Sequence, residues 1–395
     1  MSRPFLLAVN DFPPHLGGEA TLYHALARHL RRDEAVVLAP SAPGDAEIDA
    51  AIPVEVVRCW LPAHGGTISR VARGLLGGLH LAGLLARRRF DYLVCGQLLS
   101  IGAPLSLLAR LWRLPYAVFV HGADLADYAQ RAAWRSLARS ILSGAHTVVV
   151  NSRFTAALVD RLLPGAARRM IVLPMGVEPP SCVEEAQLAE LRDRYDLPRG
   201  PVLLSVARLV PMKGHDVVIE ALPHLVARYP ELVYLIVGQG ERRPALERLA
   251  RERGVRAHVR FAGVVPRLEL AAHYAVATLF VQLSRATGTY DGLEGFGLTF
   301  LEAASQGIAS IAGRSGGVPE AISDGESGVL VPAEDPAAFA QAADRLLSNP
   351  GELRRLSEGA RRWAALHTWE ATARCIRSLT HDLRAGAVAR AGRAS

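Results

Sequence analysis

The sequence is almost without lysine. It holds 45 basic residues, and Lys213 is the one lysine among them, so the other 44 are arginines. Cysteine is also scarce: Cys59, Cys95, Cys182 and Cys375 form no Cys-x-x-Cys pair and no cluster with the spacing of metal ligands. This distribution excludes a disulfide-stapled scaffold and favours a reducing setting. We therefore expect the protein in the cytoplasm.

Other absences exclude further classes of protein. No apolar run reaches the roughly 20 residues that span a bilayer, and the short apolar run before Asn10 does not resemble a signal peptide. A Gly-x-Gly-x-x-Gly fingerprint is missing, which argues against a nicotinamide dehydrogenase. Basic residues do not cluster with aromatic residues, so we expect no nucleic-acid partner.

The composition fits two globular domains. Half of the 395 residues are apolar and 21% are charged, which excludes a disordered chain. At about 150 residues per domain, the length suits two domains that each have their own core. The net charge of +7 suits ligands that carry phosphate, or an anionic membrane surface.

Short apolar runs alternate with amphipathic segments along most of the chain. The strands expected in the first half are Phe5–Val9, Ala35–Leu38, Val54–Val57, Tyr92–Cys95, Tyr116–Val120, Thr147–Val150 and Met170–Leu173. Those expected in the second half are Val202–Val206, Val233–Val237, His258–Phe261, Leu279–Gln282, Ser310–Ala312 and Gly328–Val331. The longest helices expected are Glu19–Leu30, Ser69–Arg88, Asp127–Leu142, Asp335–Leu347 and Glu352–Leu366. This alternation predicts an α/β fold of two Rossmann-like domains, with parallel sheets that face each other across a cleft.

The domain limits follow from a polar stretch around Pro179–Arg199, after which the pattern restarts. We expect an N-terminal domain at 1–180 and a C-terminal domain at 181–367. A last helix, Trp369–Leu383, lies in the remaining segment 368–395, which ends in a frayed tail.

Candidate site residues follow the strands, because ligands bind beyond the carboxyl ends of parallel strands. After Val202–Val206 comes Arg208, and Lys213 follows five positions later. A guanidinium forks onto two phosphate oxygens, and an ammonium group adds a compact charge, so this pair suits a phosphate. Gly238 and Val265 follow the next two strands, where a nucleotide base could meet backbone groups.

The segment from Glu294 to Glu302 carries two carboxylates eight positions apart, the first ahead of an expected helix and the second inside it. On one continuous helix that spacing is about 12 Å along the axis and about 80° around it, so the two cannot act on one atom. They can instead grip two parts of an extended ligand. Between them, the amides of Phe296, Gly297 and Leu298 open the helix and form a seat for phosphate. We expect a sugar at Glu294, a diphosphate at the helix start and a ribose at Glu302.

Two features of the first half complete the candidate site. Gly17 and Gly18 stand at the start of a helix, where exposed amides favour an anion, although such a pair is equally found in turns. His121 directly follows a core strand, a position that suits a polar site as well as a structural histidine.

Together these motifs resemble the retaining family-4 glycosyltransferases of the GT-B fold. The residues that carry the resemblance run in order along the chain: Gly17-Gly18, His121-Gly122, Arg208…Lys213-Gly214, Glu294-x7-Glu302 and Ser315–Glu320. The resemblance implies a nucleotide-sugar donor held mainly by the second half and an acceptor held mainly by the first. It also implies that the last helix returns to the first domain and that no metal or other cofactor is needed.

The resemblance also assigns roles to residues of the second half. Arg208 and Lys213 would neutralise the departing diphosphate, and Glu302 would accept hydrogen bonds from the ribose hydroxyls. Glu294 and the Phe296–Leu298 amides would hold the sugar and its phosphate. Retention of configuration without a carboxylate nucleophile points to a front-face displacement, in which the donor's own phosphate acts as the base.

In the first half, the resemblance places His121 near the reacting sugar, as a fourth catalytic residue beside the pair of cations and the first glutamate. Gly17 and Gly18 would contact the distal phosphate. The segments Arg285–Leu293 and Ala312–Gly317 are similar to those of phosphatidylinositol mannosyltransferases.

Several alternatives stay open. The donor could be of the GDP-mannose, UDP-glucose or UDP-N-acetylglucosamine type, and the hydroxyl acceptor a lipid-linked molecule, a glycan or a small metabolite. The chain could instead be a sugar-nucleotide-binding protein without activity, or a phosphorylase-like enzyme with pyridoxal phosphate on Lys213. The segment Arg70–Arg89 either packs on the sheet or lies on an anionic membrane surface, which would place the protein at the inner face of the plasma membrane.

Overall fold

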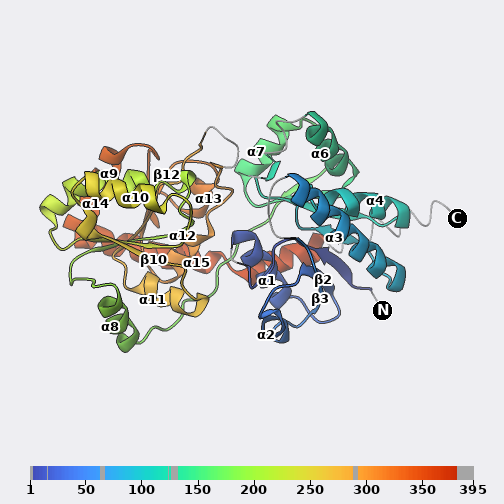
Figure 1. Cartoon of the computed structure of the whole chain (residues 1–395), viewed down its shortest axis with the longest axis horizontal. Coiled ribbons are helices and arrows are strands. Elements are labelled where there is room, and N and C mark those ends of the chain that lie inside the picture. The colour runs from blue at the N-terminus through green and yellow to red at the C-terminus, as the bar shows by residue number, and fades with distance from the viewer. Residues whose placement is uncertain are drawn as a thin grey trace. The chain divides into compact units, whose positions relative to one another are not determined.

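The computed structural model describes residues 3–15, 17–62, 67–122, 124–125, 132–287 and 292–379. The chain divides into two units, each with its own sheet (Figure 1). Unit 1 consists of Met1–Met175 and Trp369–Ser395, and unit 2 consists of Gly176–Thr368. The limits expected from the sequence, at 180/181 and 367/368, lie within five residues of these.

Unit 1 is built on a parallel sheet of seven strands in the order β3-β2-β1-β4-β5-β6-β7. Its strands are β1 (Phe5–Ala8), β2 (Ala35–Pro40), β3 (Glu55–Cys59), β4 (Leu93–Cys95), β5 (Tyr116–Val120), β6 (Thr147–Val150) and β7 (Met170–Val172). All seven were expected, and the largest differences are at β2 and β3, which each end two residues later than their apolar runs. β1 is the third strand in this order and pairs in parallel with β2 and β4. The segments that follow β1, β4 and β5 therefore emerge at one edge of the sheet.

The helices of unit 1 connect these strands. They are α1 (Gly18–His29), α2 (Asp45–Ala50), α3 (Thr67–Arg87), α4 (Gly102–Trp112), α6 (Ala132–Gly144) and α7 (Arg153–Leu162). The helix expected at Asp127–Leu142 corresponds to α6, and its first five residues lie outside the described part of the chain. A last helix at 369–379 returns to unit 1. Thr372 Oγ1 donates to Pro174 O over 2.6 Å, and Arg377 pairs with Glu34 at 3.1 Å, which fixes this helix to unit 1.

Unit 2 is built on a parallel sheet of six strands in the order β10-β9-β8-β11-β12-β13. Its strands are β8 (Val202–Val206), β9 (Val233–Val237), β10 (Val259–Gly263), β11 (Leu279–Gln282), β12 (Ser310–Gly313) and β13 (Gly328–Val331). Its α-helices are α8 (Glu185–Arg194), α9 (His215–Arg228), α10 (Arg243–Glu252), α11 (Leu270–Ala275), α12 (Leu298–Ser305), α13 (Val318–Ala321), α14 (Pro336–Ser348) and α15 (Pro350–Leu366). Three short 3-10 helices are η1 (Pro211–Lys213), η2 (Arg256–His258) and η3 (Arg267–Glu269). The two expected helices, Asp335–Leu347 and Glu352–Leu366, correspond to α14 and α15.

Helix α8 lies within the polar stretch Pro179–Arg199, where the sequence predicted no helix. It begins with a capping box in which the side chains of Glu184 and Gln187 each accept a hydrogen bond from the other's backbone amide. Only Leu191 of this helix is buried. Because α8 has almost no apolar stripe, the periodicity that reveals other helices is missing from its sequence.

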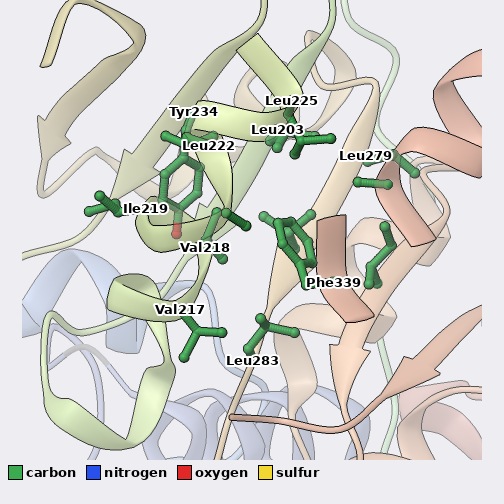
Figure 2. Packing of buried hydrophobic residues seen from close by; sticks show 14 of the residues in the cluster. Leu203, Val217, Val218, Ile219, Leu222, Leu225, Tyr234, Leu279, Leu283 and Phe339 are labelled. Carbon is green, nitrogen blue, oxygen red and sulfur yellow. The ribbon is translucent and has the colours of Figure 1, made fainter. Parts of the chain in front are cut away.

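The sheet of unit 2 is buried on both faces, as parallel strands require. On one face, Val281 belongs to a cluster that α9 and α14 complete with residues such as Leu222 and Phe339 (Figure 2). On the other face, the ring of Phe280 lies 5.4 Å from that of Phe300 in α12. Successive residues of β11 thus face opposite layers. Helix α12 is fixed on the sheet by its own apolar residues.

Candidate active site

The candidate site of unit 2 is centred on the carboxylate of Glu294, which lies in the loop between β11 and α12. Lys213, the last residue of η1, donates a hydrogen bond from Nζ to Glu294 Oε2. The same oxygen accepts hydrogen bonds from Ser284 Oγ at 3.1 Å and Gln282 Nε2 at 3.2 Å. The Lys213 and Glu294 side chains are 14% and 13% exposed. Lys213, 81 positions away in sequence, therefore meets the end of β11 and the loop before α12 at one oxygen.

The electrostatics of this cluster favour an ionised glutamate. Burial acts to raise the pKa of Glu294, but the charge of Lys213 and its hydrogen bond outweigh burial. Ser284 and the charge of Arg208 act in the same direction, so the pKa of Glu294 lies below its ordinary value of 4.5. Arg208 itself is exposed in the loop after β8. The two cations and the glutamate expected from the sequence thus form one electrostatic group.

The loop that carries Glu294 is supported by the glycines of the Ser315–Glu320 motif. The amide of Gly317 donates to the carbonyl of Glu294 over 2.8 Å. A Cβ on Gly316, which has φ +58°, would lie 2.4 Å from that carbonyl oxygen, and a Cβ on Gly317 would lie 2.0 Å from the oxygen of Gly295. Both positions need glycine because backbone packs directly on backbone.

Helix α12 begins beside this loop. Gly297 is its N-cap residue, with φ +100°, and no side chain caps the helix. The first amides of α12, from Leu298 onward, therefore have no side-chain partner at the cap, and they favour a negative charge. Phe296 is buried and fixes the entry to the helix. The phosphate seat expected at these residues stays a prediction, on a helix start that no side chain caps.

Glu302 lies one turn further along α12. Tyr274 of α11 donates its hydroxyl to Glu302 Oε2 over 2.8 Å. Burial and the charge of Glu302 hold the pKa of Tyr274 well above its ordinary value of 10, so this hydroxyl stays a donor. The tyrosine orients the carboxylate that the sequence analysis assigned to a ribose.

Gly238 and Val265 lie beyond β9 and β10, the two strands on one side of β8. The amide of Gly238 donates to Gly263 O over 2.7 Å, and a Cβ on Gly238 would lie 2.0 Å from Ala207 O. Gly238 thus packs against the loop that carries Arg208. Val265 is buried two residues after β10. Both residues are at the same edge of the sheet as the charged group.

In unit 1, His121 lies directly after β5 and is largely buried. Its Nε2 is 2.6 Å from the hydroxyl of Tyr23 and 3.1 Å from the carbonyl oxygen of Gly96. The backbone amides of His121, Gly122 and Leu125 donate to Asp124 Oδ1 at 2.8–3.1 Å. The ring and the loop of His121 are therefore both held in place.

Helix α1 carries the other expected residues of unit 1. Gly17 is its N-cap residue and Gly18 its first residue. Glu19, the next residue, accepts a hydrogen bond from Gln97 Nε2 at 2.5 Å, and the same amide donates to Asp11 at 2.8 Å. Burial raises the pKa of Glu19, against the opposing effect of the nearby histidine.

Sequence reasoning missed several partners of these residues. Gln282 and Ser284 end β11 or follow it, and Gln97 follows β4, so the rule that ligands bind beyond strand ends could have found all three. Tyr274 and Tyr23 lie within helices among apolar residues, and their sequence carries no comparable signal. In the described ranges, no group of three or more His, Cys, Asp or Glu side chains could hold a metal ion. No helix in that part of the chain is long and apolar enough to cross a membrane.

Comparison with known proteins places this site in a family. A family model described as glycosyl transferases group 1 matches residues 189–363, and one described as a glycosyl transferase 4-like domain matches residues 17–176. The GDP-mannose-dependent alpha-(1-6)-phosphatidylinositol monomannoside mannosyltransferase of Mycolicibacterium smegmatis is 34% identical over 92% of this chain and 94% of its own length. A D-inositol 3-phosphate glycosyltransferase of Frankia alni is 32% identical over 85% of this chain and 82% of its own.

Solved structures agree in fold. Anabaena HepE in complex with UDP and glucose has a TM-score of 0.80 at 17% identity and covers 96% of this chain and 99% of its own. Sucrose-phosphate synthase of Thermosynechococcus elongatus has a TM-score of 0.80 at 22% identity, over 97% and 100%. These likenesses confirm the two Rossmann-like domains of the GT-B fold.

The chain therefore belongs to the group 1 glycosyltransferases, the family that its motifs resemble. It is an enzyme that transfers a hexosyl group. Because the relatives named above are transferases, a binding protein without activity and a phosphorylase-like enzyme are not favoured.

Proposed function

We propose that this enzyme is a retaining mannosyltransferase that moves a mannosyl group from GDP-mannose to a hydroxyl of an inositol-bearing acceptor. The observation that carries the proposal is the charged group of Arg208, Lys213 and Glu294 beside the uncapped start of α12. The donor is supported by the relative from Mycolicibacterium smegmatis, whose name specifies GDP-mannose. The acceptor class is supported by two relatives, of which one acts on a phosphatidylinositol mannoside and one on an inositol phosphate.

The site suits a diphosphate that gains charge as it leaves. Arg208 and Lys213 supply two positive charges. The first backbone amides of α12 add the positive end of the helix dipole, which also stabilises a negative charge. Glu294 would hold the sugar, since its carboxylate stays ionised and can accept hydrogen bonds from hydroxyls. Glu294 also pairs with Lys213, so each of these two largely buried charges has a counter-charge.

The remaining roles follow from position along the sheet edge. Glu302, oriented by Tyr274, would accept hydrogen bonds from the ribose hydroxyls. Gly238 and Val265, beyond the neighbouring strands, would pack against the base through backbone groups. Gly17 and Gly18 at the start of α1 would contact the distal phosphate.

In the proposed reaction the acceptor oxygen attacks the anomeric carbon on the face from which the diphosphate leaves. A carbon–oxygen bond to the acceptor forms as the carbon–oxygen bond to the phosphate breaks. The proton of the acceptor hydroxyl passes to the departing phosphate, so nucleoside diphosphate leaves protonated and no other co-reactant is needed. His121 would hydrogen-bond the reacting sugar, with its ring kept in place by Tyr23.

The test is a transfer assay with purified enzyme and a matched set of donors. GDP-mannose, UDP-glucose and UDP-N-acetylglucosamine are each offered with phosphatidylinositol mannoside and with inositol 3-phosphate. We expect product from GDP-mannose, with the α-configuration kept when the product is analysed by NMR, and the same rate in excess EDTA. Preference for a UDP-sugar, an inverted product or loss of activity in EDTA would contradict the donor, the mechanism or the metal independence, respectively.

Two variants separate the site from general stability. Lys213→Met should lower the turnover number by about a hundredfold, because one group that stabilises the leaving charge is lost. Arg260→Met removes another partly buried cation of unit 2. Arg260 lies on β10, and its guanidinium is 3.0 Å from the carboxylate of Asp196. That control variant should keep full turnover.

A further inference from the structure

His215 is the first residue of α9, and its side chain is buried although it is polar. Its ring has two partners: Nδ1 lies 2.9 Å from the hydroxyl of Tyr234, and Nε2 lies 3.2 Å from the carbonyl oxygen of Arg208. Burial lowers the pKa of His215 to about 4, and the charge of Lys213 acts in the same direction. At neutral pH the ring is therefore uncharged, with one nitrogen that donates and one that accepts.

The partners of His215 decide which nitrogen carries the hydrogen. A carbonyl oxygen only accepts, so Nε2 donates to Arg208 O and Nδ1 accepts from the hydroxyl of Tyr234. Burial raises the pKa of Tyr234 above its ordinary value of 10, so this hydroxyl keeps its proton. Tyr234 belongs to β9 and to the buried cluster on which α9 packs (Figure 2), and Ser205 Oγ on β8 lies 2.7 Å from its oxygen. His215 thus joins the loop after β8 to two strands of the sheet.

This hydrogen bond ties together the two ends of the loop that carries both cations. Arg208 is at one end of the loop, His215 at the other, and Lys213 lies between them. The side chain of Arg208 is exposed, so its position depends on its backbone more than on packing. Gly214 fixes the far end against the segment after β11, because a Cβ at this position would lie 2.1 Å from Leu283 O. The end that carries Arg208 is held by the ring of His215.

We propose that His215 is a positioning residue for Arg208, and that its ring keeps the guanidinium where the leaving diphosphate gains charge. This inference rests on the proposed function, which assigns Arg208 and Lys213 to that diphosphate. A cation that stabilises a developing charge must be in place beforehand, because reorganisation during the step would cost part of the gain. His215 acts through the backbone of Arg208, since its ring is buried and both of its nitrogens are bonded.

The test compares two substitutions of His215 in the transfer assay with the three donors named above. His215→Leu cannot donate to Arg208 O, and it should lower the turnover number about tenfold while the KM for the donor changes less than about twofold. The loss is smaller than that of a missing cation, because Val210 N still donates to Arg208 O at 3.0 Å. His215→Gln presents an amide Nε2 to the same carbonyl, and it should restore the turnover number to within about threefold of the wild type. Both variants should fold, since Tyr234 keeps Ser205 as a partner.

A double variant separates positioning from a general loss of structure. Arg208→Met already lacks the guanidinium, so adding His215→Leu should lower its turnover number by no more than about twofold. The matched control is His258→Leu. The ring Nδ1 of His258 lies 2.9 Å from Leu232 O, and both residues directly precede strands at the opposite edge of the same sheet. This control variant loses a bond of the same kind and should keep full turnover.

The outcomes distinguish this inference from the proposed function. The inference is overturned if His215→Leu turns over like the wild type while Arg208→Met is impaired. It is also overturned if His215→Gln is as slow as His215→Leu, or if the two losses multiply in the double variant. Wild-type turnover in Arg208→Met would overturn the proposed function, and this inference with it.

Discussion

The substitution Glu294→Gln tests the charged group of unit 2 most directly. Glutamine keeps the shape of the side chain and one acceptor oxygen, but it removes the negative charge that three donors share: Lys213, Ser284 and Gln282. The ion pair lost is largely buried, since its two side chains are 14% and 13% exposed. Glutamine can still accept from Ser284 and Gln282, so the main loss is the charged hydrogen bond with Lys213. Such a bond contributes about 1.5–3 kcal/mol, and we expect the free energy of unfolding to fall by about 2 kcal/mol.

The effect on catalysis should exceed the effect on stability. Glu294 is expected to hold the transferred sugar and to balance Lys213 at the leaving diphosphate. Loss of one such contact costs about 3 kcal/mol of transition-state stabilisation, which is about a hundredfold in turnover number. The assay measures the turnover number and the thermal midpoint of the same preparation. A folded variant with wild-type turnover would refute the assignment of this site.

The pH dependence of this stability loss gives a second check. Because the pKa of Glu294 is lowered in the folded state, its charge stabilises the fold above its ordinary value of 4.5. This contribution disappears as the pH falls through the lowered pKa. The difference in stability between wild type and Glu294→Gln should therefore be full at pH 7 and shrink below pH 4.5. The control Glu247→Gln removes an exposed pair with Arg243 on α10, and it should cost no more than about 0.5 kcal/mol at either pH.

Three further predictions concern the surroundings of this group. Gly316→Ala should abolish activity because its Cβ would strike the supporting carbonyl at 2.4 Å, whereas Gly325→Ala, also at positive φ but with nothing within 4 Å, should retain full turnover and lose about 1 kcal/mol of stability. Burial lowers the pKa of His215 to about 4, so the unfolded state binds the extra proton between about pH 6.5 and pH 4. Urea unfolding should then show about 2 kcal/mol less stability at pH 5 than at pH 7, and an unchanged pH slope in His215→Gln would contradict this. Tyr274→Phe should raise the KM for the nucleotide sugar about fivefold with the turnover number kept, because Glu302 loses its orienting donor; an unchanged KM would remove that role.

Much of the fold could be predicted because it depends on local patterns. Each of the thirteen expected strands is present in the described part of the chain, since a buried parallel strand is a short continuous apolar run with turn residues on either side. The alternation of such runs with helices also implies parallel sheets. Helix α8 escaped prediction because a single buried leucine leaves no periodic signal.

The candidate site was predictable in position and unpredictable in its contacts. Arg208 and Lys213 stand out because they follow a parallel strand, at the end where ligands bind, and Glu294 because it stands just ahead of a helix. That Lys213 and Glu294 share a hydrogen bond across 81 positions of sequence is decided by how η1 and the loop before α12 pack at one edge of the sheet.

The sequence by itself determined the class of fold, the family and the residues that we propose bind a nucleotide diphosphate, because these depend on residue type and spacing along the chain. The tertiary structure decided which groups meet: Tyr274 with Glu302, and Gly317 with the carbonyl of Glu294. Such contacts join segments that have no periodic relation in the sequence. Their partners are fixed only when whole layers pack and each buried polar group must find a donor or an acceptor.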